Sequence, residues 1–167
     1  MKGKINPLNK IILLSKRLRE RGKTVGLVLG SFDILHMGHI NLFRFAKKHA
    51  DILIVGLDND EIIKITKGNK RPINNYKRRS EFLSELSSVD YVFKIEKIYK
   101  HGDKKSFIHL ETLLKSIKPD YVFTSVRCDE LWKERKKLAE SLGIKFLEEK
   151  SKVMHTEDIL KILESEM

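Results

Sequence analysis

The sequence contains a single cysteine, Cys128, among its 167 residues. One thiol excludes a disulfide within the chain, and it excludes any metal site built from several cysteines. Proteins of a reducing compartment typically show this scarcity. We therefore expect a cytoplasmic protein whose stability comes from a hydrophobic core rather than from covalent cross-links.

Long hydrophobic runs, internal repeats and low-complexity tracts are absent as well. In residues 1–22 the apolar stretch is limited to Ile11–Leu14, set among lysines and arginines, which is too short for a signal peptide or a membrane span. The length suits one domain with a sizeable core. We expect a leading helix in residues 1–22, an α/β core in residues 23–148, and a C-terminal loop and helix in residues 149–167.

Positive charge is in excess, with 34 lysines and arginines against 23 aspartates and glutamates, a formal net charge of +11. A basic chain can bind nucleic acid, but these lysines are spread over nearly every expected helix face. The sequence also carries no signature of a nucleic-acid-binding module. Solvated helix surfaces explain most of the charge, phosphate-rich small substrates would also favour it, and nucleic acid is not the favoured partner.

The most informative segment is Leu29–His39, which leaves an apolar strand, turns at a glycine and enters a helix. Gly30 permits close approach of the backbone, and Gly38 opens a helix whose free amides and dipole favour an anion. His36 and His39 would flank that anion and donate to its oxygens near neutral pH. The pattern predicts a phosphate site and nucleotidyl transfer, while two histidines that serve only as helix caps remain the alternative.

Apolar runs alternate with segments of helical periodicity along the rest of the chain. The expected strands are Val25–Leu29, Asp51–Leu57, Val89–Ile95, Tyr121–Thr124 and Ile144–Leu147. Helices are expected over Pro7–Arg21 and Gly38–His49, and loops over Asn69–Asn75 and Glu96–Lys105. This alternation predicts an α/β fold, a single Rossmann-like doubly wound domain with a five-stranded parallel sheet. Ligands of such sheets bind beyond the carboxyl ends of the strands, where the winding direction reverses.

The segment Gly30–His39 resembles the Gly-x-Phe-Asp-x-x-His-x-Gly-His signature of the nucleotidyltransferase superfamily that includes cytidylyltransferases and small adenylyltransferases. Lys67–Ile73, followed by Arg79, resembles the Lys-Gly-x-x-Arg-Pro-Ile loop and downstream arginine of that superfamily. The resemblance runs from about Gly22 to Val92. Within the superfamily it is greatest to the adenylyltransferase domain that activates heptose 1-phosphate, and glycerol-3-phosphate cytidylyltransferase is similar over the same stretch.

The resemblance implies a reaction in which the phosphate of a second substrate attacks the α-phosphorus of ATP or CTP and pyrophosphate leaves. Catalysis would consist mostly of positioning and electrostatic stabilisation. Mg²⁺ would accompany the triphosphate without a dedicated protein site for the metal. The acceptor would be a phosphorylated small molecule such as a sugar phosphate or a polyol phosphate, and a homodimer is expected from the resemblance alone.

The expected catalytic residues are His36, His39 and Lys47, the last because similar enzymes carry a phosphate-binding lysine there. Lys47 follows His39 by eight residues and returns to the same helix face, although a solvated lysine is the alternative. Asp33 either caps the following turn or orients the histidines and the second substrate. The expected substrate-binding residues are Asp33, Lys47, Lys70 and Arg71.

The expected nucleotide-binding residues are Gly30, Ser31, Phe32, Asp33, Gly38, Arg79, Asp129, Lys150, His155 and Thr156. Arg79 can grip a β- or γ-phosphate with two parallel hydrogen bonds, unless it is an ordinary helix-surface arginine. Ser31 offers a hydroxyl or backbone donor, and Phe32 is expected to pack beneath the motif.

Two segments depart from the family pattern. The strand that ends at Thr124 lacks the Gly-Gly-Asp turn of relatives, and Asp129 is the only candidate match, so the preferred base stays open. At the start of the last helix, His155–Asp158 replaces the hydroxyl-rich triplet of relatives. The acidic residues in that turn would repel a phosphate unless Mg²⁺ or Lys150 and Lys152 offset them.

Two functions therefore remain open. We favour an active nucleotidyltransferase, because the residues expected to act most directly on the phosphates are all present. The alternative is a catalytically impaired nucleotide- or RNA-binding protein that retains the fold.

Overall fold

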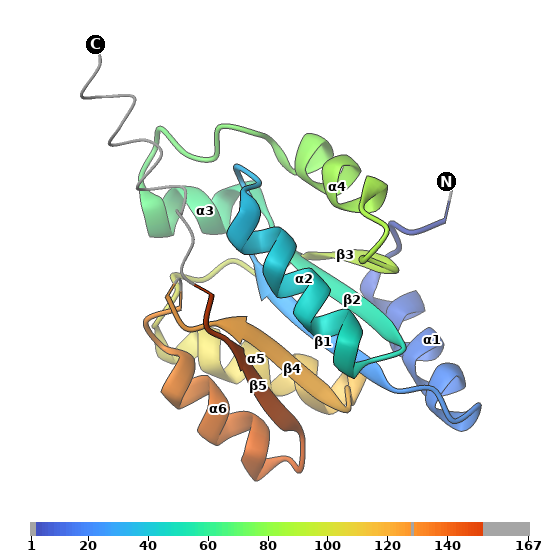
Figure 1. Cartoon of the computed structure of the whole chain (residues 1–167). Coiled ribbons are helices and arrows are strands. Elements are labelled where there is room, and N and C mark those ends of the chain that lie inside the picture. The colour runs from blue at the N-terminus through green and yellow to red at the C-terminus, as the bar shows by residue number, and fades with distance from the viewer. Residues whose placement is uncertain (1–2, 128, 152–167) are drawn as a thin grey trace.

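The computed structural model describes residues 3–127 and 129–151 of the chain. Over this part, strands and helices alternate along the sequence, except that two helices follow one another between the second and third strands (Figure 1). The strands are β1 (Val25–Gly30), β2 (Ile52–Asp58), β3 (Tyr91–Ile95), β4 (Tyr121–Ser125) and β5 (Lys145–Glu149). The helices are α1 (Leu8–Glu20), α2 (Met37–His49), α3 (Asp60–Lys67), α4 (Tyr76–Glu85), α5 (Lys104–Ile117) and α6 (Trp132–Ser141).

The strands of the described residues form one parallel sheet in the order β3-β2-β1-β4-β5. The central strand β1 is apolar on both faces, and Val25, Leu27 and Val28 are buried. A strand that helices cover on both sides requires such a run, because neither face meets water. The expected α/β class with a five-stranded parallel sheet is confirmed.

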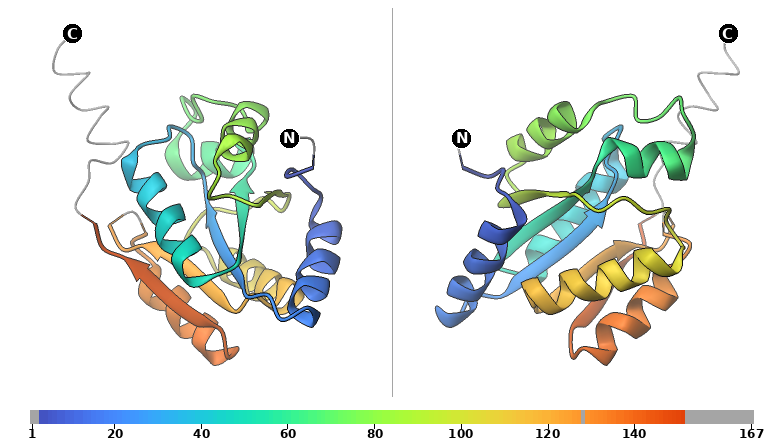
Figure 2. Two further views of the ribbon diagram at one scale, coloured as in Figure 1. Left: turned by 45° about the vertical axis from the view of Figure 1, so that its right-hand side comes forward. Right: turned by 180° about the vertical axis from the view of Figure 1, so that it is seen from behind.

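Helices cover both faces of this sheet, as the views from two sides in Figure 2 show. On one face α1, α5 and α6 contribute Ile11, Leu114 and Ala139 to one hydrophobic core. On the other face α2 and α4 contribute Phe43 and Leu83 to a second core. Two cores on opposite faces of one sheet are what double winding produces, so this part of the prediction is also confirmed.

Element boundaries follow the sequence pattern closely. Each observed strand lies within two residues of its expected ends, and the leading helix α1 lies inside the predicted Pro7–Arg21. The loop expected over Glu96–Lys105 ends slightly earlier, since α5 begins at Lys104. The helix expected near the C-terminus lies outside the described residues. Within those residues, no helix has the length and apolar composition needed to cross a bilayer.

The winding direction of the sheet reverses beside β1, at the carboxyl ends of the central strands. After β3 at the sheet edge, the chain crosses back through α5 to β4, which pairs with the other side of β1. The carboxyl ends of β1, β2 and β4 therefore meet, at Gly30, Asp58 and Ser125. In doubly wound sheets the divergence of the chain at this point opens a crevice for ligands.

Candidate active site

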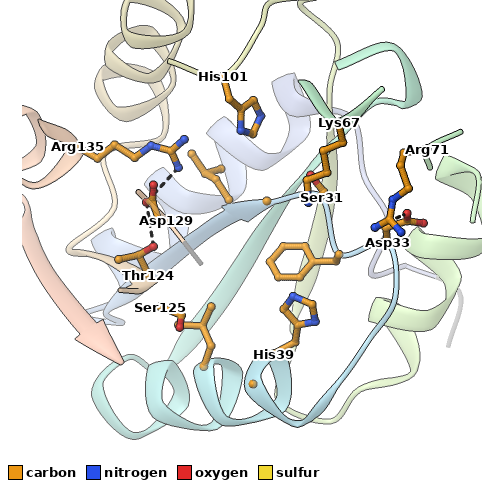
Figure 3. Close-up of a pocket in the computed structure, with 15 residues that line it drawn as sticks. Ser31, Asp33, His39, Lys67, Arg71, His101, Thr124, Ser125, Asp129 and Arg135 are labelled. Carbon is orange, nitrogen blue, oxygen red and sulfur yellow. Dashed lines mark hydrogen bonds and ion pairs between the residues drawn. The ribbon is translucent and has the colours of Figure 1, made fainter. Parts of the chain in front are cut away.

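A pocket of about 170 Å³ lies at this end of the sheet (Figure 3). Its walls come from the ends of β1 and β4, from the start of α2, and from side chains beyond β2 and on α6. Its polar side chains belong to Ser31, Asp33, His39, Lys67, Arg71, His101, Thr124, Ser125, Asp129 and Arg135. Three permanent cations and two histidines face two carboxylates, so the lining favours an anionic ligand.

The N-terminus of α2 opens onto this pocket through Gly38 and His39. His36 is the N-cap residue, and its Nδ1 accepts a hydrogen bond from the Gly38 amide at 3.1 Å. The two imidazole rings are adjacent, with their centroids 3.8 Å apart. The histidines therefore do not flank the pocket equally, because His39 lines it whereas His36 caps the helix.

The turn between β1 and α2 has an unusual backbone conformation. Phe32 has a φ of +45°, in the left-handed region that bulky residues rarely adopt. Its buried ring lies edge-on to His39, with the centroids 5.0 Å apart. A Cβ at Gly30 would lie 3.1 Å from the same ring, so glycine makes room for it. Phe32 thus packs beneath the motif and orients His39, and strained residues of this kind cluster at functional sites.

Asp33 fixes the loop of residues 69–75 to the pocket. Its carboxylate accepts hydrogen bonds from the amides of Ile73 and Asn74, at 2.9 and 2.8 Å. It also pairs with Arg71 at 3.0 Å, while its side chain is only 2% exposed. Asp33 therefore anchors the loop and positions Arg71, and its expected role toward the second substrate stays a prediction.

Arg71 and Lys67 bring positive charge to the pocket from either end of the loop that resembles the family. Arg71 Nη1 is buried and has no hydrogen-bond partner among the described residues. Lys67 is the last residue of α3 and lines the same pocket. A buried donor without a partner is costly, and a phosphate oxygen would satisfy it. Lys67 was absent from the expected site residues, although its place in the Lys-Gly-x-x-Arg-Pro-Ile loop was a signal for it.

The carboxylate of Asp58, at the end of β2, connects Ser31 to His101. Ser31 Oγ donates to Asp58 Oδ2 at 3.0 Å, and His101 Nε2 lies 3.2 Å from the same oxygen. The buried carboxylate fixes the imidazole, which projects into the pocket (Figure 3). Sequence reasoning missed His101, because it lies in an irregular segment and belongs to no motif.

Asp129 lies at the pocket wall formed by the end of β4, as expected. Its carboxylate accepts hydrogen bonds from Thr124 Oγ1 at 3.1 Å and from the Leu131 amide at 3.2 Å. Arg135 of α6 pairs with it at 3.3 Å and also lines the pocket. Arg135 was not predicted, since nothing in the sequence separates it from the other basic residues of that helix.

Lys47 does not reach the pocket, which corrects its assignment as a catalytic and substrate-binding residue. It lies in the last turn of α2, about 12 Å along the helix axis from His39 at 1.5 Å per residue. Its Nζ donates to the Asp51 carbonyl at 2.5 Å and pairs with Asp90 at 2.8 Å. Helical spacing places the two residues on one face but at opposite ends, so Lys47 joins the amino ends of β2 and β3.

Arg79 also has a structural position, which corrects its assignment as a phosphate contact. The side chain is fully buried. Its guanidinium donates to the carbonyl oxygens of Asn74, Ser31 and Asp58, and pairs with Asp60 at 2.7 Å. With its nitrogens engaged in this way, Arg79 supports the backbone beneath the pocket rather than gripping a phosphate.

Two further expected residues lie away from the pocket. Lys70 is exposed in the loop of residues 69–75, and Lys150 is exposed with its Nζ 3.4 Å from Glu148. Neither lines the pocket among the described residues, so their expected contacts with substrate and nucleotide stay predictions. His155 and Thr156 lie outside the described residues. In the described part of the chain, no cluster of three or more His, Cys, Asp or Glu residues could hold a metal ion.

Comparison with known proteins gives a family for this fold and site. Residues 27–162 match the family described as cytidylyltransferase-like. The bifunctional protein HldE of Desulfatibacillum aliphaticivorans is 35% identical over 118 residues, which are 71% of this chain and 22% of that protein. HldE of Nitratiruptor sp. is 39% identical over 116 residues, 70% of this chain and 23% of that protein. The chain thus spans about a fifth of these relatives' length.

Solved structures share the fold. A lipopolysaccharide core biosynthesis protein from Thermoplasma volcanium has a TM-score of 0.58 and 27% identity, over 79% of this chain and 100% of that chain. A pantoate-beta-alanine ligase from Francisella tularensis has a TM-score of 0.63 at 17% identity, over 90% of this chain and 67% of that chain, and shows the fold alone. These matches confirm the resemblance to nucleotidyltransferases that the motif indicated, and the chain belongs to the cytidylyltransferase-like family.

Proposed function

We propose that this protein transfers AMP or CMP from ATP or CTP to the phosphate of a small molecule and releases pyrophosphate. The observation that carries the proposal is the pocket at the reversal point of the sheet. There the N-terminus of α2 and His39 share one cationic pocket with Lys67 and Arg71. Helix amides, an imidazole and fixed cations are the groups that stabilise charge on a transferring phosphoryl group.

The N-terminus of α2 and the Asp33–Arg71 pair would each act on the phosphates in this reaction. An oxygen of the acceptor phosphate forms a bond to the α-phosphorus, and the bond from that phosphorus to the bridging oxygen of pyrophosphate breaks. Gly38 and His39 would donate to the α-phosphate oxygens, with His36 holding the helix terminus. Arg71, positioned by Asp33, would donate its unpartnered Nη1 to a phosphate oxygen. No covalent intermediate with the protein is needed.

Mg²⁺ would accompany the triphosphate and neutralise part of its charge. The pocket carboxylates are already engaged, Asp33 by two amides and Arg71, and Asp129 by a hydroxyl, an amide and Arg135. The described residues therefore do not fit a protein-held metal, and phosphate oxygens and water would be the ligands of the ion.

For the acceptor we propose a sugar phosphate, with a polyol phosphate as the second choice. The identity with HldE proteins and the likeness to a lipopolysaccharide core biosynthesis protein support a sugar phosphate. The resemblance to the adenylyltransferase domain for heptose 1-phosphate favours ATP over CTP. A homodimer in the cytoplasm completes the proposal, on the same resemblance alone.

The proposal is tested by pyrophosphate release. The purified protein is incubated with Mg²⁺ and either ATP or CTP, against a panel of sugar 1-phosphates and polyol phosphates. Release with one nucleotide and one acceptor class supports the proposal and assigns the base. Silence across the panel, together with a rise in melting temperature on adding nucleotide, would instead favour a binding protein that has lost turnover.

A further inference from the structure

His101 enters the pocket from a segment that carries none of the family motifs. The segment connects β3 to α5, and the His101 amide donates to Thr66 Oγ1 in α3 at 3.3 Å. This contact fastens His101 next to Lys67, the residue that follows Thr66. Figure 3 shows His101 and Lys67 on one side of the end of β1 and His39 on the other. The pocket therefore has two separate walls that can bind an anion.

The position of His101 is built into the core rather than left to a surface loop. Asp58 is 2% exposed and holds Nε2 at 3.2 Å, whereas the imidazole itself keeps 25% of its surface exposed. Arg79, fully buried, donates to the Asp58 carbonyl at 2.8 Å and so fixes the backbone of that aspartate. Tyr99 packs beside the imidazole, with the ring centroids 5.9 Å apart. The side chain is thus held in place before any ligand arrives.

A histidine held in this way suits a phosphate monoester. Asp58 accepts the hydrogen of Nε2, so the second ring nitrogen is the one that can meet a ligand. That nitrogen can form a hydrogen bond with a phosphate oxygen, either by accepting from a P–OH group or by donating when it carries a proton. Lys67 adds a permanent positive charge on the same wall.

We propose that His101, positioned by Asp58, binds the phosphate of the acceptor together with Lys67. This inference rests on the proposed function, because it takes the wall of Gly38 and His39 as the site of the nucleotide's α-phosphate. In-line attack requires the acceptor phosphate to approach from another side than the leaving pyrophosphate. The wall of His101 and Lys67 lies across the end of β1 from His39 and so offers a separate approach for the acceptor. On this proposal it selects acceptors that carry a phosphate monoester over those that offer only a hydroxyl.

The test compares His101→Gln with His49→Gln. Glutamine retains an N–H that can bond to Asp58 but cannot carry a charge or share a proton with a phosphate. His49 is an exposed histidine near the end of α2, so its variant controls for the loss of an imidazole outside the pocket. We expect His101→Gln to raise KM for the acceptor at least 10-fold, with KM for the nucleotide within twofold of wild type. His49→Gln should leave both values unchanged.

A rise in KM for the nucleotide rather than for the acceptor would overturn the inference, since His101 would then contact the triphosphate. An unchanged KM for both substrates would overturn it as well. Asp58→Asn supplies the test of positioning. Because Asp58 acts on the acceptor through His101, Asp58→Asn should add less than twofold to the acceptor KM of His101→Gln. If the two substitutions instead raised the acceptor KM independently, so that their effects multiplied in the double variant, Asp58 would not act through His101.

Calorimetric titration separates this inference from the proposed function. The probes are glucose 1-phosphate and glycerol 3-phosphate, added to wild type and to His101→Gln in the presence of a non-hydrolysable nucleotide analogue. Weaker binding to the variant supports the phosphate subsite even if no pyrophosphate is ever released, which would contradict only the proposed function. If wild type binds neither probe, or binds one no better than the variant does, the subsite is refuted.

Discussion

Lys47 joins two strands at the amino edge of the sheet. It pairs with Asp90 at 2.8 Å, and the same carboxylate accepts the Leu53 amide at 2.7 Å. Lys47→Met removes a half-buried ion pair, so we expect the free energy of unfolding to fall by about 1 kcal/mol. Urea denaturation measures this change, and kcat/KM should stay within twofold of wild type. A variant with normal stability and a large loss of turnover would show that Lys47 acts in catalysis.

Arg79 is expected to matter far more for stability than for binding. Arg79→Met would leave Asp60 and the carbonyl oxygens of Ser31 and Asp58 without their buried donor. Removing one partner of a buried charged network typically costs about 3 kcal/mol or more. We expect a loss of that size in denaturant unfolding, with Arg79→Lys intermediate. Wild-type stability combined with a tenfold rise in nucleotide KM would show that Arg79 contacts phosphate after all.

Residue roles were predictable where they depend on local backbone, and not where they depend on distant partners. Gly38 and His39 line the pocket because a strand, a turn and a helix start follow one another in sequence. Arg79 was misassigned because its partners lie up to 48 residues away and consume its donors. His101 was missed for the same reason, since it lies in an irregular segment and its partners Asp58 and Thr66 are distant in the sequence.

Among the connecting elements, the loop of residues 69–75 depends on Asp33. Asp33→Ala would remove an ion pair to Arg71 and the acceptors of two loop amides at once. We expect trypsin to cleave at Lys70 at least 10-fold faster in this variant, because the loop opens more often. Asp103→Ala is the matched control, since Asp103 begins α5 without a side-chain capping bond. Equal cleavage rates in the two variants would show that Asp33 does not hold the loop.

The strands and helices themselves were predicted well, because each depends on a short and regular pattern. β2 is buried along nearly its whole length, so its apolar run is continuous and its ends are sharp. Asn59 and Asn75 cap α3 and α4 through their side chains, which shows why these helices begin where they do. The sequence pattern could not predict that Asp33 would hold the loop of residues 69–75, because an aspartate in a turn fits several roles equally well.

For the molecule as a whole, acid should lower stability before the carboxylates titrate. Burial, with the charge of Lys97, lowers the pKa of His109 below its ordinary value of 6.5. As the pH drops below about 6.5, His109 therefore takes up a proton in the unfolded chain before it does so in the folded chain. The free energy of unfolding falls as a result. The carboxylates of Asp51 and Glu148 have lowered pKa values, so their contribution is lost only at still lower pH.

His109→Leu should reduce this acid sensitivity. Both ring nitrogens of His109 are buried without a hydrogen-bond partner among the described residues, so leucine sacrifices no bond. In wild type, protonation of the unfolded chain lowers the free energy of unfolding by up to about 1.4 kcal/mol for each pH unit below 6.5. We therefore expect the difference in unfolding free energy between pH 7 and pH 5.5 to be smaller in His109→Leu, by up to about that amount. Urea denaturation at both pH values measures it. An unchanged difference would mean that His109 is protonated in the folded state too.

The location of the site was predictable at this scale because topology decides it. A doubly wound parallel sheet has one point where the winding reverses, and the Gly30–His39 segment ends the strand beside it. The convergence of Lys67, His101 and Arg135 on the pocket was not predictable, because α3, the segment between β3 and α5, and α6 bring their side chains together from distant parts of the sequence. The motif therefore indicated the wall formed by Gly38 and His39, and the wall formed by Lys67 and His101 emerged only from the structure.

On the proposed function, nucleotidyl transfer takes place at the pocket where His39 meets the N-terminus of α2. The rate of pyrophosphate release by wild type, His39→Ala and His49→Ala under saturating substrates tests this location. We predict a loss of about 100-fold or more in kcat for His39→Ala and no change for His49→Ala. Undiminished turnover by His39→Ala would contradict the account.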